Sequence, residues 1–279
     1  MMLRVALAQY QISRPADLAS FLAGIEALCT QARGRADLLV LPEYAAMALA
    51  GAFVSAPDVQ AELAAVVSRT ADILDGMKQI AKRQNIWLLG GSLPMQDGSG
   101  AIFNRAPLIE PGGKIEFQDK HVMTRFERES WHITQGALPR IFDTPWGKIG
   151  IAICYDSEFP SLVRSQVRAG AFAILVPTCT DTLAGFNRVR LSARARAIEN
   201  QCYVGMSPTI GAAPWSATLD DNQGYAAAFG PVDRGFPDDG VLARGVMNQP
   251  GLVFADLDPQ RIESVRQTGA VLNHADWPA

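Results

Sequence analysis

Cys154 is the residue of this sequence best placed to act as a nucleophile. It follows the apolar, glycine-containing run 149–153, and residues 155–160 then begin a helix. A strand-to-helix turn presents a side chain at the edge of a sheet, where a helix N-terminus favours the thiolate and offers backbone N–H groups to a developing oxyanion. A buried structural cysteine is the alternative, and position alone does not decide between the two.

The other three cysteines carry weaker signals. Cys29 and Cys202 lie on the apolar stripes of predicted helices, so we interpret them as core residues. Cys179 follows the predicted strand 172–176, which would bring it to the same sheet edge as Cys154. Because no CxxC spacing occurs, the sequence predicts free thiols, with neither a disulfide framework nor a metal site.

A thiol nucleophile needs a base, and Glu43 fits that role. It follows the apolar segment 38–42 and therefore ends a buried strand, where burial raises the pKa of a carboxyl group. A helix-capping or salt-bridging glutamate is the alternative. The histidines His121, His132 and His274 have no obvious orienting partner, although a Cys–His pair that uses His132 stays open.

Lys120 is a third candidate, because it follows the predicted strand 115–118. A lysine there could stabilise negative charge that develops on a substrate. A single lysine is weak evidence, since most lysines are solvated at the surface.

These candidates lie at strand ends in a chain that alternates strands and helices. Strand–helix–strand order occurs around Glu43 and again around Cys154, which predicts parallel strands joined by helical crossovers. Hairpin signals at 111–114 and 145–148 add antiparallel pairs, so we expect an α/β fold with two mixed sheets between helices. The other predicted elements are strands 5–9, 86–89, 203–206 and 252–255, helices over 59–81 and 158–169, and a helix with the apolar stripe Leu191, Ala195, Ile198 and Cys202.

Composition limits the class of protein. Of the 279 residues, 48% are hydrophobic, so the chain can bury a substantial core, and we expect a single domain over 1–279. The net charge of −3, with both signs interspersed, gives no reason to expect nucleic acid or a membrane as partner. The chain start lacks the features of a signal peptide, and no apolar run approaches a membrane span, so a cytoplasmic location is expected.

Together the three candidate segments resemble the nitrilase superfamily of carbon–nitrogen hydrolases, whose members carry Glu, Lys and Cys in that chain order. Glu43 stands in Leu-Pro-Glu-Tyr, Lys120 in Asp-Lys-His and Cys154 in Gly-Ile-Ala-Ile-Cys-Tyr-Asp. The resemblance covers almost the whole chain. One departure is that His121 directly follows Lys120, where many members have a residue between them.

This resemblance implies a fold and a set of roles. The expected fold is an αββα sandwich of two mixed β-sheets between helix layers, paired into a homodimer or a larger homo-oligomer, with no metal and no cofactor. Glu43, Lys120 and Cys154 would form the catalytic triad. An auxiliary glutamate would support them, for which Glu127 is the first choice and Glu129 the second.

The resemblance also points to a substrate class. Members that act on nitriles usually have Cys-Trp-Glu at the nucleophile, whereas Cys-Tyr-Asp is closer to the amidase branches, so we expect a small amide, cleaved through a thioester. A nitrilase or an N-carbamoyl hydrolase is the alternative, and a catalytically idle binding protein is a third. Segment 208–240 is expected to cover the entrance. The candidate substrate-binding residues, chosen by position, are Tyr44, Tyr155, Glu158, Phe159, Thr178 and Cys179.

Overall fold

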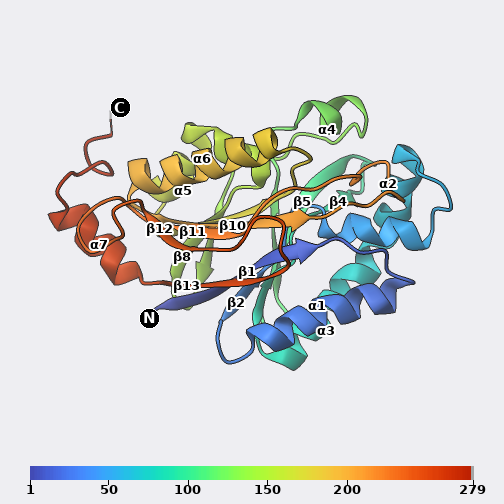
Figure 1. Ribbon diagram of the computed structural model, residues 1–279, viewed down its shortest axis with the longest axis horizontal. Coiled ribbons are helices and arrows are strands. Elements are labelled where there is room, and N and C mark those ends of the chain that lie inside the picture. The colour runs from blue at the N-terminus through green and yellow to red at the C-terminus, as the bar shows by residue number, and fades with distance from the viewer. Residues whose placement is uncertain (278–279) are drawn as a thin grey trace.

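The first of two β-sheets contains the first and the last strand of the sequence. The computed structural model describes residues 1–277 (Figure 1). In this sheet the strands follow the order β4-β5-β3-β2-β1, with β13 on the other side of β1 and β6 against β5. Its members are β1 (Leu3–Gln11), β2 (Leu38–Val40), β3 (Trp87–Leu89), β4 (Leu93–Gln96), β5 (Ile102–Ile109), β6 (Ile115–Asp119) and β13 (Gly251–Leu257).

The second sheet has a parallel centre and antiparallel edges. Strands β8, β9 and β10 run parallel, whereas β7 and β11 pair antiparallel with β8 and β10. A short parallel pairing of β1 with β10, at Tyr10–Thr209 and Gln11–Ile210, joins the two sheets. The strands are β7 (Ile141–Thr144), β8 (Gly147–Ile151), β9 (Ala173–Thr178), β10 (Tyr203–Ile210), β11 (Ala227–Phe229) and β12 (Val241–Arg244).

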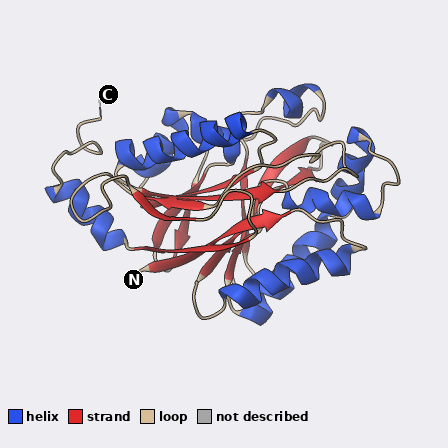
Figure 2. Ribbon diagram, viewed as in Figure 1, coloured by secondary structure: helices blue, strands red, loops and turns tan. Residues whose placement is uncertain are grey.

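Helices cover both outer faces of this pair of sheets (Figure 2). Helices α1 (Leu18–Ala32) and α3 (Thr70–Gln84) lie on the side of the first sheet, and α5 (Pro160–Arg168) and α6 (Leu183–Asn200) lie on the side of the second (Figure 1). The predicted αββα sandwich is therefore confirmed. The remaining helices are η1 (Ala45–Ala52), α2 (Val59–Val67), α4 (Arg125–Glu129), η2 (Cys154–Glu158) and α7 (Pro259–Thr268). None of the helices in residues 1–277 has the length and apolar character that crossing a membrane requires.

The core follows from strand periodicity. In β1, Val5 and Leu7 belong to the cluster between the two sheets, whereas Ala6 and Ala8 pack with the residues of α1 and α3. Because successive side chains of a strand point to opposite faces, β1 contributes to both cores. It also pairs with β2, the strand that precedes Glu43.

Two helix predictions were wrong in detail. The helix predicted over 59–81 is two helices, because the hydroxyl of Thr70 bonds the carbonyl of Val67 and competes with helix continuation between α2 and α3. In α6, Leu191 and Ile198 are 54% and 37% exposed, so the predicted apolar stripe does not face the core. The buried face consists mainly of smaller or differently spaced residues, which are Gly185, Phe186, Val189, Ala193, Arg196, Ala197 and Asn200.

The segment around Cys154 also differs from the prediction. Strand β8 ends at Ile151, and the helix predicted from residue 158 is preceded by the 3-10 turn η2, which begins at Cys154 itself. The proline that starts α5, Pro160, takes the first helical position, where its missing N–H costs no hydrogen bond.

We predict that Gly91→Ala is much more destabilising than Gly34→Ala. Both glycines have positive φ, +72° and +77°, so an alanine costs about 1–2 kcal/mol at either position. A Cβ on Gly91 would also lie 2.0 Å from the carbonyl oxygen of Pro42, beside Glu43, whereas a Cβ on Gly34 meets nothing within 4 Å. Urea unfolding measures both variants, and equal losses of unfolding free energy would contradict the close approach at Gly91.

Candidate active site

Cys154 is held in a strained conformation at the end of β8. Its φ is +47°, in the left-handed region that non-glycine residues rarely occupy, and its side chain is buried. The hydroxyl of Thr178 donates to Cys154 Sγ at 3.4 Å, and Sγ lies 3.8 Å from the carbonyl oxygen of Cys179. The end of β9 therefore orients the thiol, and strain of this kind often marks a functional site.

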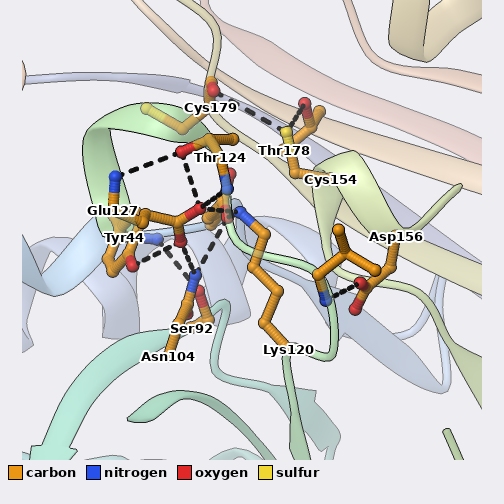
Figure 3. Close-up of polar contacts among 12 residues, drawn as sticks. Tyr44, Ser92, Asn104, Lys120, Thr124, Glu127, Cys154, Asp156, Thr178 and Cys179 are labelled. Atoms are coloured by element: carbon orange, nitrogen blue, oxygen red, sulfur yellow. Dashed lines mark hydrogen bonds and ion pairs between the residues drawn. The ribbon is translucent and has the colours of Figure 1, made fainter. Parts of the chain in front are cut away.

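Lys120 lies beside the buried carboxylate of Glu127 (Figure 3) and also pairs with the buried carboxylate of Glu43. Its Nζ is 2.8 Å from Oε1 of Glu43 and 2.6 Å from Oε2 of Glu127, and all three side chains are at most 3% exposed. An ammonium group has three N–H donors, and these contacts use two of them. Within residues 1–277 the third has no hydrogen-bond acceptor, and Lys120 lines the cavity described below.

The two carboxylates differ in how fully they are hydrogen-bonded. Glu127 accepts from Tyr44 and Asn104 at Oε1, and from Lys120 and both the N–H and the hydroxyl of Thr124 at Oε2. Glu43 accepts from Asn104 at 3.0 Å and from Lys120, both at Oε1. Among residues 1–277 no other side-chain nitrogen or hydroxyl donates to the Glu43 carboxylate, and a hydrogen bond with the Cys154 thiol acts to lower its pKa.

Asn104 was missed by the sequence analysis. It is fully buried in β5, and its Nδ2 bridges Glu43 and Glu127 at 3.0 and 2.9 Å. A lone asparagine in a strand matches no motif, and its only signal is a polar residue within an otherwise largely apolar segment.

Tyr44 has φ of +56° and directly follows Glu43, which turns the chain away from the strand end.

Burial and charge shift the pKa values of these groups in different directions. Burial, reinforced by the charge of Glu127, raises the pKa of Glu43 although Lys120 opposes it. For Glu127, burial acts upward, but Lys120 and the hydrogen bonds bring the net pKa below its usual range. Burial disfavours the charged form of Lys120, yet the two glutamates hold its pKa well above the usual value. Lys120 therefore stays charged.

The prediction that Cys154 favours a thiolate is wrong for this structure. Burial, followed by the charge of Glu43, raises the pKa of the Cys154 thiol well above its usual value, although Lys120 and Thr178 act in the opposite direction. The short turn η2 does not offset the lost hydration. The sulfur is thus a protonated thiol at neutral pH, so a role as nucleophile would require a base.

Asp156 connects the turn η2, which begins at Cys154, to the residues that follow Lys120. Its two carboxylate oxygens accept from the backbone N–H groups of His121 and Val122 at 3.0 and 2.8 Å. Burial raises the pKa of Asp156 to about 6, with these hydrogen bonds acting in the opposite direction. The residues that directly follow Lys120 are therefore fixed to the turn that begins at Cys154. In the sequence, Asp156 is recognisable only as the last residue of the Gly-Ile-Ala-Ile-Cys-Tyr-Asp segment.

A cavity of about 500 Å3 brings the candidates together. Glu43, Lys120, Glu127 and Cys154 all line it. Four of the six predicted substrate-binding residues also do so, namely Tyr44, Tyr155, Glu158 and Cys179.

The other two predicted contacts are not among the lining residues. Phe159, which directly follows the 3-10 turn η2, packs its ring against Tyr155 at 4.9 Å between centroids. Thr178 is buried behind Cys154 and contacts its sulfur. Within segment 208–240, residues 217–222 line the cavity, as expected of a cover, whereas Phe229 is buried in β11.

The residues that the sequence left open as alternatives, Glu129 and the three histidines, do not line the cavity. Glu129 pairs with Arg125 at the surface, so Glu127 is the glutamate beside Lys120. None of the three histidines lines the cavity, and His132 is exposed. No group of three or more His, Cys, Asp and Glu side chains in residues 1–277 is arranged to hold a metal ion.

Replacing Lys120 by methionine is expected to cost about 3–5 kcal/mol of unfolding free energy at pH 7, because it leaves two buried carboxylates without a cation. With the ammonium gone, the pKa values of Glu43 and Glu127 rise in the folded state, so the folded variant binds a proton that the unfolded chain releases. The deficit relative to the parent protein should therefore shrink as the pH falls from 8 to 5.

Urea unfolding over that pH range measures the effect. The control is Lys114→Met, at a lysine whose side chain is 60% exposed and pairs with Glu116. A deficit for Lys120→Met that does not depend on pH would contradict the electrostatic explanation.

Two proteins are similar to this chain in sequence over much of its length. The chain is 33% identical over 269 residues to "Probable hydrolase YhcX" of Bacillus subtilis, a match that covers 96% of this chain and 52% of that protein. The chain thus spans about half the length of this relative. It is also 30% identical over 200 residues to the omega-amidase NIT3 of Saccharomyces cerevisiae, covering 68% of this chain and 65% of the relative.

Solved structures and a family match complete the comparison. Crystalline Nit3 of Saccharomyces cerevisiae, a member of branch 10 of the nitrilase superfamily, superposes with a TM-score of 0.77 at 26% identity, covering 99% of this chain and 97% of that one. An amidase from Nesterenkonia has the same fold, with a TM-score of 0.73 at 24% identity over 95% and 96% of the two chains. The carbon-nitrogen hydrolase family matches residues 4–267. This chain therefore belongs to the carbon-nitrogen hydrolases of the nitrilase superfamily.

Proposed function

We propose that this protein is an amidase that cleaves small amides through a thioester on Cys154. The observation that carries the proposal is the meeting of a carboxylate, an ammonium group and a thiol in one cavity of about 500 Å3. Each group has the state that the chemistry needs: Glu43 has a raised pKa, Lys120 remains charged, and Cys154 holds its proton until a base removes it.

Glu43 acts as the general base in the first half of the reaction. It takes the proton of the Cys154 thiol, and the sulfur attacks the amide carbon to form a tetrahedral intermediate. Lys120 offers its third N–H, and the backbone N–H of Tyr155, at the start of η2, has no acceptor inside the turn. Both donors would stabilise the oxyanion, which is usually a large contribution to catalysis.

The second half regenerates the enzyme. Protonated Glu43 gives its proton to the departing ammonia or amine as the carbon–nitrogen bond breaks, which leaves a thioester. Glu43 then removes a proton from water, and the resulting hydroxide attacks the thioester carbon. Collapse of this second intermediate releases the carboxylic acid and returns the proton to the sulfur.

The cavity wall gives some information on the substrate. Beyond the triad, acidic residues outnumber basic ones in the wall, and Glu158 lies 3.6 Å from Arg188, so a strongly anionic substrate is not favoured. The acidic residues are Glu127, Glu158, Asp181, Asp220 and Asp221, and the basic ones are Arg125 and Arg188. A volume of about 500 Å3 suits a small or medium-sized molecule. The names of the relatives, an omega-amidase and an amidase, support an amide over a nitrile.

Three broader predictions belong with this proposal. We infer one domain over 1–279, of which residues 278–279 lie outside the described part of the chain. A homodimer or larger homo-oligomer and a cytoplasmic location are proposed as well. Size-exclusion chromatography with light scattering measures the oligomeric state.

A panel of matched amides, nitriles and N-carbamoyl compounds, with hydroxylamine as a competing acceptor, tests the function. We expect the amides to give hydroxamates, because hydroxylamine intercepts the thioester. Cys154→Ala should abolish the product, and Glu43→Gln should lower kcat by about 10²- to 10⁴-fold through loss of the general base.

His132→Ala is the matched control and should retain activity, since the exposed His132 does not line the cavity. Loss of activity in this variant, together with survival of Glu43→Gln, would favour a Cys–His hydrolase. Turnover of nitriles or N-carbamoyl compounds alone would replace the amidase proposal by one of these activities. If Cys154 reacts with iodoacetamide no faster than Cys179 or Cys202, the idle binding protein is favoured.

A further inference from the structure

Glu62 is a buried carboxylate outside the proposed triad. It lies on α2 and is 1% exposed. Its Oε2 accepts from the hydroxyls of Ser216 and Thr218, both at 2.6 Å, and its Oε1 accepts from the N–H of Ala217 at 2.7 Å. Within residues 1–277 no Lys, Arg or His forms an ion pair with it. Three neutral donors from one short segment thus hold the carboxylate.

That segment is part of the cavity wall. We call residues 216–222 the strap, and all of them except Ser216 line the cavity. The far end of the strap is fixed near the nucleophile, because the amide of Asn222 donates to Gly211 and Leu219 and its Oδ1 accepts from Cys179 Sγ at 3.1 Å. The strap is therefore held at one end by Asn222, beside Cys179, and at the other end by Glu62.

Helix α2 also contacts a second segment next to the cavity wall. The side chain of Gln60 donates to the carbonyl of Ser130, which directly precedes the cavity residue Trp131. Two residues on one helix thus contact two separate segments at the cavity wall, although neither side chain lines the cavity. Movement of the strap away from α2 would widen the site without displacing Glu43, Lys120 or Cys154.

We infer that Glu62 is a positioning residue that sets the size of substrate the cavity accepts. By fixing the strap it keeps the site narrow and selects compact acyl groups over long or branched ones. This inference rests on the proposed amidase function, whose substrates would occupy the same cavity. The role differs from that of Glu127, which contacts Lys120 directly.

Glu62→Gln tests the inference because it keeps the shape of the side chain. One carboxylate oxygen becomes an NH2 group, which donates and cannot accept. If the NH2 group faces Ala217, it cannot accept from the Ala217 N–H. If it faces Ser216 and Thr218, their hydroxyls must reverse to accept from it. The hydroxyl of Ser216 has little freedom to reverse, since it already accepts from the N–H groups of Thr218 and Leu219 at 3.1 Å. We expect faster hydrogen exchange in residues 211–224 and a KM for a short amide on the order of tenfold higher. The kcat should change less than about threefold.

Substrate length gives the more specific readout. In a series of amides of increasing acyl length, the parent protein should discriminate sharply against long members, and Glu62→Gln should discriminate less. Glu263→Gln, at an exposed carboxylate on α7, is the matched control and should leave KM and exchange unchanged. Ser216→Ala removes a partner from the other side, and its effect should not add to that of Glu62→Gln.

Two results would overturn the inference. One is faster exchange in the strap with unchanged KM and unchanged length preference. The other is a fall in kcat alone. Should Glu62→Gln fail to fold, Ser216→Ala carries the same test with a smaller change.

The outcome can be separated from failure of the proposed function. If the parent protein hydrolyses no amide, alkylation of Cys154 by iodoacetamide and by the bulkier N-phenylmaleimide still reports access to the cavity. Glu62→Gln should then reduce the preference for the smaller reagent. An unchanged preference would overturn the role of Glu62 whatever the reaction of the enzyme is.

Discussion

The ammonium group of Lys120, placed between the carboxylates of Glu43 and Glu127, is the interaction on which the site depends. Two buried acids and one buried cation leave one negative charge in excess, which water cannot solvate there. The structure resolves this excess unequally. Glu127 accepts five hydrogen bonds and stays ionised, whereas Glu43 accepts fewer and has a raised pKa. The same charge that makes the cluster costly to bury makes Glu43 a proton acceptor.

The fold brings these groups together through strand ends. Glu43 follows β2, Lys120 follows β6 and Cys154 follows β8, and the sandwich places the three ends around one cavity. Left-handed backbone occurs at Cys154 and at Tyr44, which directly follows Glu43. The chain therefore turns sharply at both places where a proposed triad residue lies. Asp156, in the turn η2 after β8, accepts from the backbone of the residues that follow Lys120 and β6. These hydrogen bonds link the two sheets at the site.

Much of this arrangement can be predicted from the sequence. Apolar runs that end in Glu43 and Cys154, and a hairpin strand that ends before Lys120, indicate the strand ends, and chain order indicates the family. Asn104 could not be predicted, because its role comes from pairing of β5 with its neighbours rather than from a local pattern. The state of the Cys154 thiol was predicted wrongly, since sequence reveals a helix start but not the depth of burial. Leu191 on α6 was misplaced for a similar reason: an apolar periodicity does not say which face a neighbouring layer covers.

The protonation of the two glutamates tests the central claim most directly. A 13C NMR titration of protein labelled at glutamate side-chain carboxyls, with Glu43→Gln and Glu127→Gln for assignment, measures both groups. Glu43 should titrate above the ordinary glutamate range and Glu127 below it. Equal titration of the two carboxyls, or the reverse order, would contradict the view that one ammonium group leaves Glu43 as the base.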